Sequence, residues 1–211
     1  MNKFVSGLFL CFGVVALCWA SPCARAAGQL NVGMAAADLG SLDPHRSATT
    51  QDKAIIGWMF NGLVRFKPGS INPETIEPDL AEKWESSPDQ LQWIFHLRHG
   101  VQCNNNFGEL TAEDVVFSLK RAASADSSAF SSDFANLSSI EATDPYTVRI
   151  TFKSHIPAPL GLFTNYQGGN IVCKKAVEQL GPDFRTKAVG TGPFAFAGQF
   201  GGALCLTATS L

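Results

Sequence analysis

The chain has 211 residues, of which 45% are hydrophobic, 10% aromatic and 16% charged, and its formal net charge is −2. This length allows one large domain or two small ones, and the apolar fraction is enough to form a sizeable core. The low and nearly balanced charge excludes a basic face for nucleic acid and an acidic tail, so no nucleic-acid partner is expected.

The first 26 residues have the features of a secretory signal peptide. Lys3 supplies a positive charge, residues 4–20 form an uncharged apolar run, and residues 24–26 read A-R-A, a small-residue cleavage motif. An uncleaved membrane anchor is the alternative, but about 17 apolar residues are at the short limit for a membrane span. We therefore predict cleavage after Ala26 and export of the mature chain.

Upstream of residue 90, short strands are predicted to alternate with one helix and with loops rich in proline and glycine. Thr49 is a candidate N-cap, and apolar residues from Ile55 onward recur at helical spacing until Asn61-Gly62 stops the helix. The expected elements in chain order are a strand at 30–34, a loop at 35–45, a helix that begins after Thr49, a short strand at 63–66 and a short helix from Pro78 to Ala81.

Two later segments alternate between apolar and polar residues, which is typical of half-buried strands. The residues expected to face the core are Leu91, Trp93, Phe95 and Leu97 in the first segment and Val148, Ile150 and Phe152 in the second. The tryptophans Trp58, Trp84 and Trp93 are each expected to pack in the core rather than to stack on a ligand.

Residues 97–122 are predicted to form a strand end, a polar turn and a capped helix. Thr111 is a suitable N-cap, and Asp114 three residues later gives an approximate capping box. Apolar residues, Val115 and Leu119 among them, follow at helical spacing, so this helix is expected to bury one face.

Beyond this helix, a loop is expected over 124–139, held by Phe130 and Phe134, and a short helix is expected over 174–180. Strands outnumber helices along the chain, and the two clean alternations indicate a sheet with one solvated face. The predicted fold class is therefore a mixed α/β, or α+β, protein with a largely antiparallel sheet.

No familiar catalytic, metal or cofactor motif occurs. G-T-G-P-F-A at 190–195 imitates a dinucleotide fingerprint, but Pro193 removes an amide that a phosphate would use and the next residues favour a strand. His96 and His99 would point to opposite faces of a strand, so a solvated His96 is favoured over a metal ligand. Neither a cofactor nor a metal is expected, and an enzyme is not predicted.

Several segments, in order, carry a resemblance to a known family. These are Leu42-Asp43-Pro44, Asn61-Gly62-Leu63-Val64, Pro78-Asp79-Leu80-Ala81, L-R-H-G-V at 97–101 with L-T-A-E-D-V-V-F-S-L-K-R at 110–121, Asp144-Pro145-Tyr146-Thr147-Val148, and Val189-Gly190-Thr191-Gly192-Pro193-Phe194. Together they resemble the family 5 extracellular solute-binding proteins, the peptide- and nickel-binding receptors of bacterial ABC importers. The resemblance covers roughly residues 30–196.

This resemblance implies a two-lobed, periplasmic-binding-protein-like fold. Residues 27–49 and 160–196 would belong to the first lobe, residues 50–159 to an inserted subdomain, and the second lobe would be absent. The implied function is capture of a peptide or a related small solute for a membrane ABC permease, by a periplasmic protein that works as a monomer.

The resemblance also points to particular residues. The loop at 35–45 is as readily explained as an ordinary connection, but the matching loop in the family borders the ligand, so Leu39, Gly40 and Ser41 are the candidate ligand contacts. Cys103 and Cys173 are the cysteine pair within the matching region, and their pairing is left open because spacing cannot show proximity.

The last 15 residues differ from the family, whose members continue into a second lobe. Residues 197–211 carry no charge, and we expect them to be an aberrant tail, poorly ordered or packed in a non-native way, in a truncated or frameshifted product that binds solute weakly. A deliberately shortened chain is the alternative. A secreted hydrolase that uses Ser41, Asp43 and His45 is the competing function, although no nucleophile is visibly placed beside a base.

Overall fold

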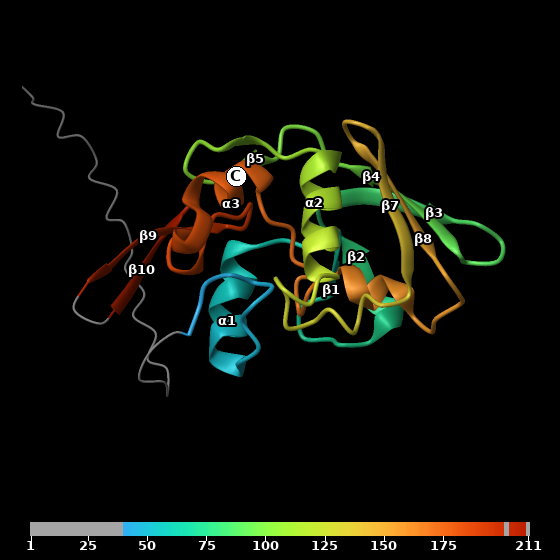
Figure 1. Ribbon diagram of the computed structural model, residues 1–211, viewed down its shortest axis with the longest axis horizontal. Coiled ribbons are helices and arrows are strands. Elements are labelled where there is room, and N and C mark those ends of the chain that lie inside the picture. Colours follow the sequence, from blue (N-terminus) through green and yellow to red (C-terminus); the bar gives the residue numbers. More distant parts are fainter. Residues whose placement is uncertain (1–39, 201–202, 210–211) are drawn as a thin grey trace, which may run out of the picture. The chain divides into compact units, whose positions relative to one another are not determined.

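A four-stranded antiparallel sheet is the largest sheet of the computed structural model, which describes residues 40–200 and 203–209 (Figure 1). Its strands, in spatial order, are β3 (Ala81–Ser86), β4 (Gln92–Leu97), β8 (Thr147–Phe152) and β7 (Leu137–Asp144). The two alternating segments are confirmed as the central strands β4 and β8, where the paired residues Phe95 and Val148 are fully buried. The expected signal peptide and the expected strand at 30–34 lie outside the described residues.

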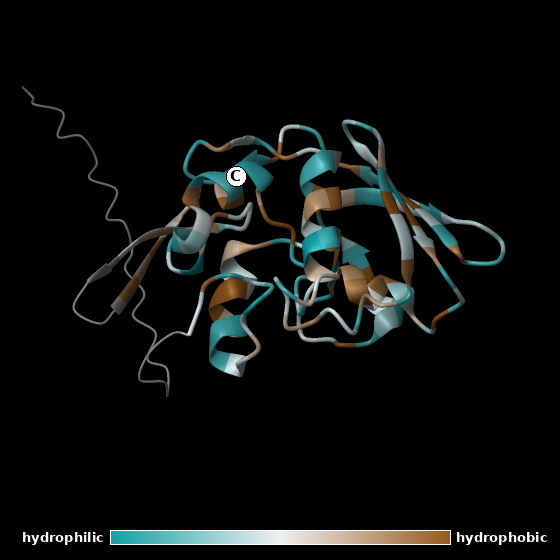
Figure 2. Ribbon diagram, in the orientation of Figure 1, coloured by the Kyte–Doolittle hydropathy of each residue, from teal (hydrophilic) through white to brown (hydrophobic). Residues whose placement is uncertain are grey.

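Helix α2 (Ala112–Ala122) lies against β7 and β8 of this sheet (Figure 1). Its predicted start and its buried face are confirmed, since Val115 and Leu119 have no exposed surface. Figure 2 shows hydrophilic residues along the turn between β3 and β4, where the chain is exposed to solvent. Among the described residues, no helix combines the length and the apolar character that crossing a bilayer requires.

The two edge strands of the sheet were not expected from the sequence. The predicted helix from Pro78 to Ala81 is wrong: Pro78 ends the short strand β2 (Ile76–Pro78), and Ala81 begins β3. The predicted loop over 124–139 is also too long, because β7 begins at Leu137. Edge strands expose polar residues on both faces, so neither segment shows the alternation that identifies a half-buried strand.

Helix α1 (Thr50–Met59) begins at the predicted N-cap, where the Thr49 hydroxyl accepts the amide of Asp52 at 3.1 Å. The strand β1 (Val64–Phe66) follows and pairs with β2. Trp93 and Trp84 are buried and partly buried, as expected, but the core position predicted for Trp58 is wrong, because its side chain is 38% exposed. Figure 2 shows the hydrophobic residues of α1 in the middle of the helix.

The C-terminal part contains α3 (Lys174–Leu180), which ends as predicted at Gly181, where φ is +50°. It also contains a hairpin of β9 (Phe194–Phe200) and β10 (Ala203–Ala208), so the described residues of the expected tail form paired strands rather than irregular chain. The remaining short elements are the 3-10 helices η1 (Pro73–Thr75), η2 (Pro159–Phe163) and η3 (Gly181–Arg185) and the paired strands β5 (Gln102–Cys103) and β6 (Gly108–Glu109).

Candidate functional site

An ion pair between Asp43 and Arg121 fastens residues 40–47, which we call the anchored loop, to helix α2. The Asp43 carboxylate, whose side chain is 2% exposed, accepts hydrogen bonds from both terminal nitrogens of Arg121 in α2. Such a two-bond contact between planar groups is geometrically specific, so it fixes the loop against the helix. The two residues are 78 positions apart, which is why no pattern in the sequence connects them.

His45 belongs to the same cluster and is held in its neutral form. Arg121 Nη1 lies 2.7 Å from His45 Nδ1, and because a guanidinium can only donate, Nδ1 must accept. The ring proton is therefore on Nε2, which donates to the backbone oxygen of Asn170 at 3.0 Å. Complete burial, and then the charge of Arg121, lower the pKa of His45 from 6.5 to about 4.

Two of the three predicted ligand contacts, Gly40 and Ser41, begin the anchored loop, whereas Leu39 lies outside the described residues. The Gly40 amide donates to Asp52 Oδ1 at 3.1 Å, and the Ser41 hydroxyl accepts the amide of Asp43 at 3.0 Å. These bonds give the loop a fixed path over the start of α1. Contact of Gly40 or Ser41 with a solute stays a prediction.

One side chain of the anchored loop and three beside it form what we call the basic rim: Arg46 from the loop, with Lys53, Phe130 and Tyr166. The Lys53 ammonium lies 5.2 Å from the centre of the Phe130 ring and 5.4 Å from that of Tyr166, which is the range of cation–π contacts. Arg46 Nη2 donates to the backbone oxygen of Asp126 at 2.9 Å. The rim therefore presents two cations and one exposed phenol ring, since the Tyr166 side chain is 59% exposed.

The glycine-rich turn at 190–193 packs on the end of α1. A Cβ atom at Gly190 would lie 2.2 Å from the backbone oxygen of Met59, and one at Gly192 would lie 2.5 Å from the Met59 carbonyl carbon. Both glycines are thus required by close packing of backbone, in agreement with the predicted turn. The exposed rings of Trp58 and Phe194, 6.3 Å apart, lie beside this turn.

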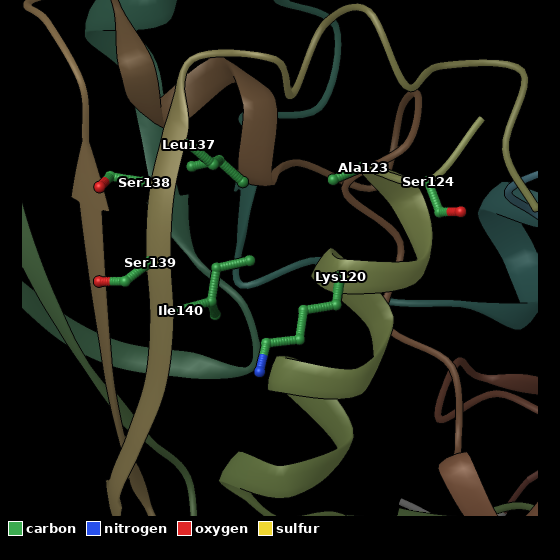
Figure 3. A pocket seen from close by; sticks show the side chains of 7 residues that line it. All are labelled: Lys120, Ala123, Ser124, Leu137, Ser138, Ser139 and Ile140. Carbon is green, nitrogen blue, oxygen red and sulfur yellow. The ribbon is translucent and has the colours of Figure 1, made fainter.

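A shallow groove of about 290 Å³ lies between α2 and β7 (Figure 3). Leu137 and Ile140 point from β7 toward the helix, Ser138 and Ser139 point away from it, and Lys120 contributes a charge from α2. A ligand site normally combines an apolar surface with several convergent polar groups. With one charged side chain facing its apolar floor, this groove is a weaker candidate than the basic rim.

Cys103 and Cys173 form a disulfide that spans 70 residues of sequence, and Cys205 is a free thiol in β10. Next to the disulfide, the amide of Lys174 donates to Asp114 Oδ1 at 2.9 Å. Residue 103 belongs to the expected inserted subdomain and residue 173 to the expected first lobe, so the bond would join these two parts of the chain.

The geometry gives no support to a hydrolytic site at Ser41, Asp43 and His45. A nucleophile and its base lie within hydrogen-bonding reach of each other. Here the two ring nitrogens of His45 face Arg121 and Asn170, and the Asp43 carboxylate is engaged by Arg121. Across residues 40–200 and 203–209, no group of three or more candidate ligands is placed to hold a metal ion.

Comparison with known proteins identifies the family. The sequence profile of bacterial extracellular solute-binding proteins, family 5 Middle, matches residues 75–199. The chain belongs to this family. It is similar to the di/tripeptide-binding protein 2 of Pseudomonas aeruginosa (strain UCBPP-PA14), with 32% identity over 160 residues, or 65% of this chain and 29% of that protein.

Two solved structures of periplasmic binding proteins have the same fold. The PBP/SBP MoaA in complex with mannopinic acid, from A.tumefacien R10, shares 46% identity with a TM-score of 0.80, covering 82% of this chain and 36% of that one. The protein DppA of Helicobacter pylori in complex with the peptide STSA shares 29% identity with a TM-score of 0.70, covering 82% and 37%. The family resemblance and the mixed α/β, periplasmic-binding-protein-like fold class are therefore confirmed. The chain spans about a third of the length of these relatives.

Proposed function

We propose that this solute-binding protein captures a peptide or a related small organic acid for a membrane ABC permease. Membership of the family supports solute binding, and the similar proteins bind di- and tripeptides, the peptide STSA and mannopinic acid. The observation that carries the proposal is the anchored loop, which the Asp43–Arg121 pair holds next to Lys53 and the exposed ring of Tyr166.

Rigidity is what makes this arrangement suitable for binding. A loop that is already fixed in the free protein loses little conformational entropy when a solute contacts it. In a two-lobed binding protein, the remaining affinity comes from a hinge motion that closes the lobes on the solute. We propose that this chain carries one face of such a site, made by residues 27–49, 50–159 and 160–196, and binds weakly by itself.

The proposed location is the periplasm, reached by cleavage after Ala26, where the protein acts as a monomer beside the permease. The cleavage is tested by N-terminal sequencing of periplasmic material, for which Ala27 is the expected first residue. A retained Met1 in the membrane fraction would contradict it.

The function is tested by a ligand screen on the exported chain, with native mass spectrometry followed by calorimetry. The panel contains di- and tripeptides and sugar-derived organic acids, with glucose as a neutral control. We expect saturable binding of one or more acids or peptides, with dissociation constants from about 0.1 to 10 mM, which corresponds to roughly 3–5 kcal/mol. No binding across the panel would overturn the proposal.

A further inference from the structure

The Lys53 ammonium in the basic rim is a positive charge that is held in place but not neutralised. Within the part of the chain that the structure describes, no carboxylate lies within 4.0 Å of it, whereas Lys187 and Arg121 each have an acidic partner at 2.9 Å or less. The Phe130 and Tyr166 rings attract the ammonium and restrict its position. They leave its three N–H donors available to an oxygen acceptor.

Three connecting segments near the Lys53 ammonium are hydrogen-bonded to each other. The Ala129 amide donates to the backbone oxygen of His45 at 2.8 Å, and His45 Nε2 reaches the backbone oxygen of Asn170 at 3.0 Å. The anchored loop, the loop that carries Phe130 and the loop that carries Tyr166 therefore meet at one place. The rim is a feature of this junction and not of a single surface helix.

We propose that the basic rim binds the carboxylate of the solute, with Lys53 as the charged contact and the Tyr166 hydroxyl as a neutral donor. This inference rests on the proposed function and adds the chemical class of the group that is recognised. Arg46 belongs to the same rim and its side chain is 48% exposed, but its Nε lies 3.8 Å from Asp43 Oδ2 and its Nη2 is bonded to the Asp126 backbone oxygen. Lys53 is therefore the cation of the rim on which the proposal rests, and Arg46 adds only to the field around it. The exposed acids Asp126 and Asp133 lie on the same loop as Phe130 and oppose this field, and Asp126 is the residue whose backbone oxygen accepts from Arg46.

The experiment compares alanylalanine, which has a free carboxylate, with alanylalaninamide, which lacks the charge, on the exported chain by NMR titration. We expect the acid to bind at least tenfold more tightly than the amide. Lys53→Met keeps the length of the side chain and its contact with the rings but removes the charge. It should therefore weaken binding of the acid about tenfold and leave binding of the amide within twofold.

Two further variants sharpen the test. Tyr166→Phe keeps the ring and removes the hydroxyl, so we expect a loss of about threefold for the acid. Lys83→Met removes an exposed lysine of β3 and should change neither affinity. Succinate distinguishes the source of the carboxylate: competition that depends on Lys53 indicates a site for organic acids in general, and no competition indicates a peptide carboxylate.

The outcomes also separate this inference from the proposed function. If the two dipeptides bind equally well, or if Lys53→Met still prefers the acid tenfold, the assignment of the solute carboxylate to Lys53 in the basic rim is wrong, while solute binding by the protein stands. If no probe and no other member of the screening panel binds, both proposals are wrong. Circular dichroism and a thermal melt show that each variant is folded before its affinity is compared.

Discussion

At the scale of single residues, Arg121 determines both the position of the anchored loop and the protonation of His45. Its guanidinium donates to Asp43 through two nitrogens, and one of these nitrogens also approaches His45 Nδ1. A buried carboxylate needs such compensation, because the loss of hydration is costly and only close hydrogen-bonded pairing offsets it. The cluster is therefore stable as a unit and fragile when one member is removed.

We expect Arg121→Met to lower the free energy of unfolding by about 3–5 kcal/mol, because the Asp43 carboxylate would stay buried without its two-bond partner. The remaining cation, Arg46, lies 3.8 Å away with a half-exposed side chain and compensates the charge less well. The double variant Arg121→Met with Asp43→Asn removes the uncompensated charge and should recover part of the loss. Urea denaturation of the two variants measures both values. A loss below about 1 kcal/mol for the single variant would mean that the pair is not buried in solution.

The lowered pKa of His45 predicts a pH dependence of stability. Between pH 6.5 and about 4, the unfolded chain binds a proton at His45 that the folded chain does not bind. The stabilisation is therefore complete above pH 6.5 and is lost as the pH falls toward 4. A shift of this size corresponds to roughly 3 kcal/mol.

The variant His45→Asn isolates this contribution, because the amide oxygen can replace Nδ1 as an acceptor but does not titrate in this range. The difference in free energy of unfolding between the wild type and His45→Asn should shrink by roughly 2–3 kcal/mol between pH 7 and pH 4.5. His155→Asn, at an exposed position, is the matched control. A constant difference for His45→Asn would contradict the neutral buried form.

At the scale of elements, α2 is fastened at its N-terminus by Asp114 more than by Thr111. Asp114 Oδ2 accepts the Thr111 amide at 2.9 Å, and Oδ1 accepts the amide of Lys174. The Thr111 hydroxyl itself donates to Asp114 at 3.3 Å. Ser118, one turn further along, accepts the amide of Val172 at 2.9 Å, so the same helix face holds a distant segment.

This arrangement predicts an order of destabilisation for three alanine variants. Leu119→Ala should cost roughly 2–5 kcal/mol, since the side chain has no exposed surface. Asp114→Ala should cost roughly 1–3 kcal/mol, because two amides lose their acceptor. Thr111→Ala should cost about 1 kcal/mol or less. Chemical denaturation gives the order, and a larger loss for Thr111→Ala than for Asp114→Ala would show that the hydroxyl is the cap.

The success of sequence reasoning for this fold follows from where each element lies in the sheet. β4 and β8 are central and half-buried, so their side chains must alternate, and both were predicted. β3 and β7 are edge strands with polar residues on both faces, and neither strand was predicted from the sequence. The site depends on contacts across long stretches of sequence: His45 looks isolated until the fold places Arg121 and Asn170 on either side of it.

At the scale of the whole molecule, three of the long-range links join described segments that the fold depends on. The Asp43–Arg121 pair connects the anchored loop with α2, and the turn at 190–193 is seated on the end of α1. The Cys103–Cys173 disulfide connects the segment before α2 with the start of α3. Each link joins parts that are distant in sequence and so closes a long loop of chain. The disulfide also restricts the unfolded chain, whereas the ion pair and the packed turn form only in the folded protein.

The last prediction concerns this disulfide. Closing a loop of this length removes conformational entropy from the unfolded chain, and the stabilisation is about 4 kcal/mol in the chain-entropy description. The double variant Cys103→Ser with Cys173→Ser should therefore lose 2–4 kcal/mol, about the usual range for a disulfide, in urea denaturation under oxidising conditions. Cys205→Ser is the matched control, because that thiol is free, and it should behave like the wild type. Dithiothreitol should lower the stability of the wild type to that of the double variant. If the reductant has no effect on the wild type, the two cysteines are not paired in the exported protein.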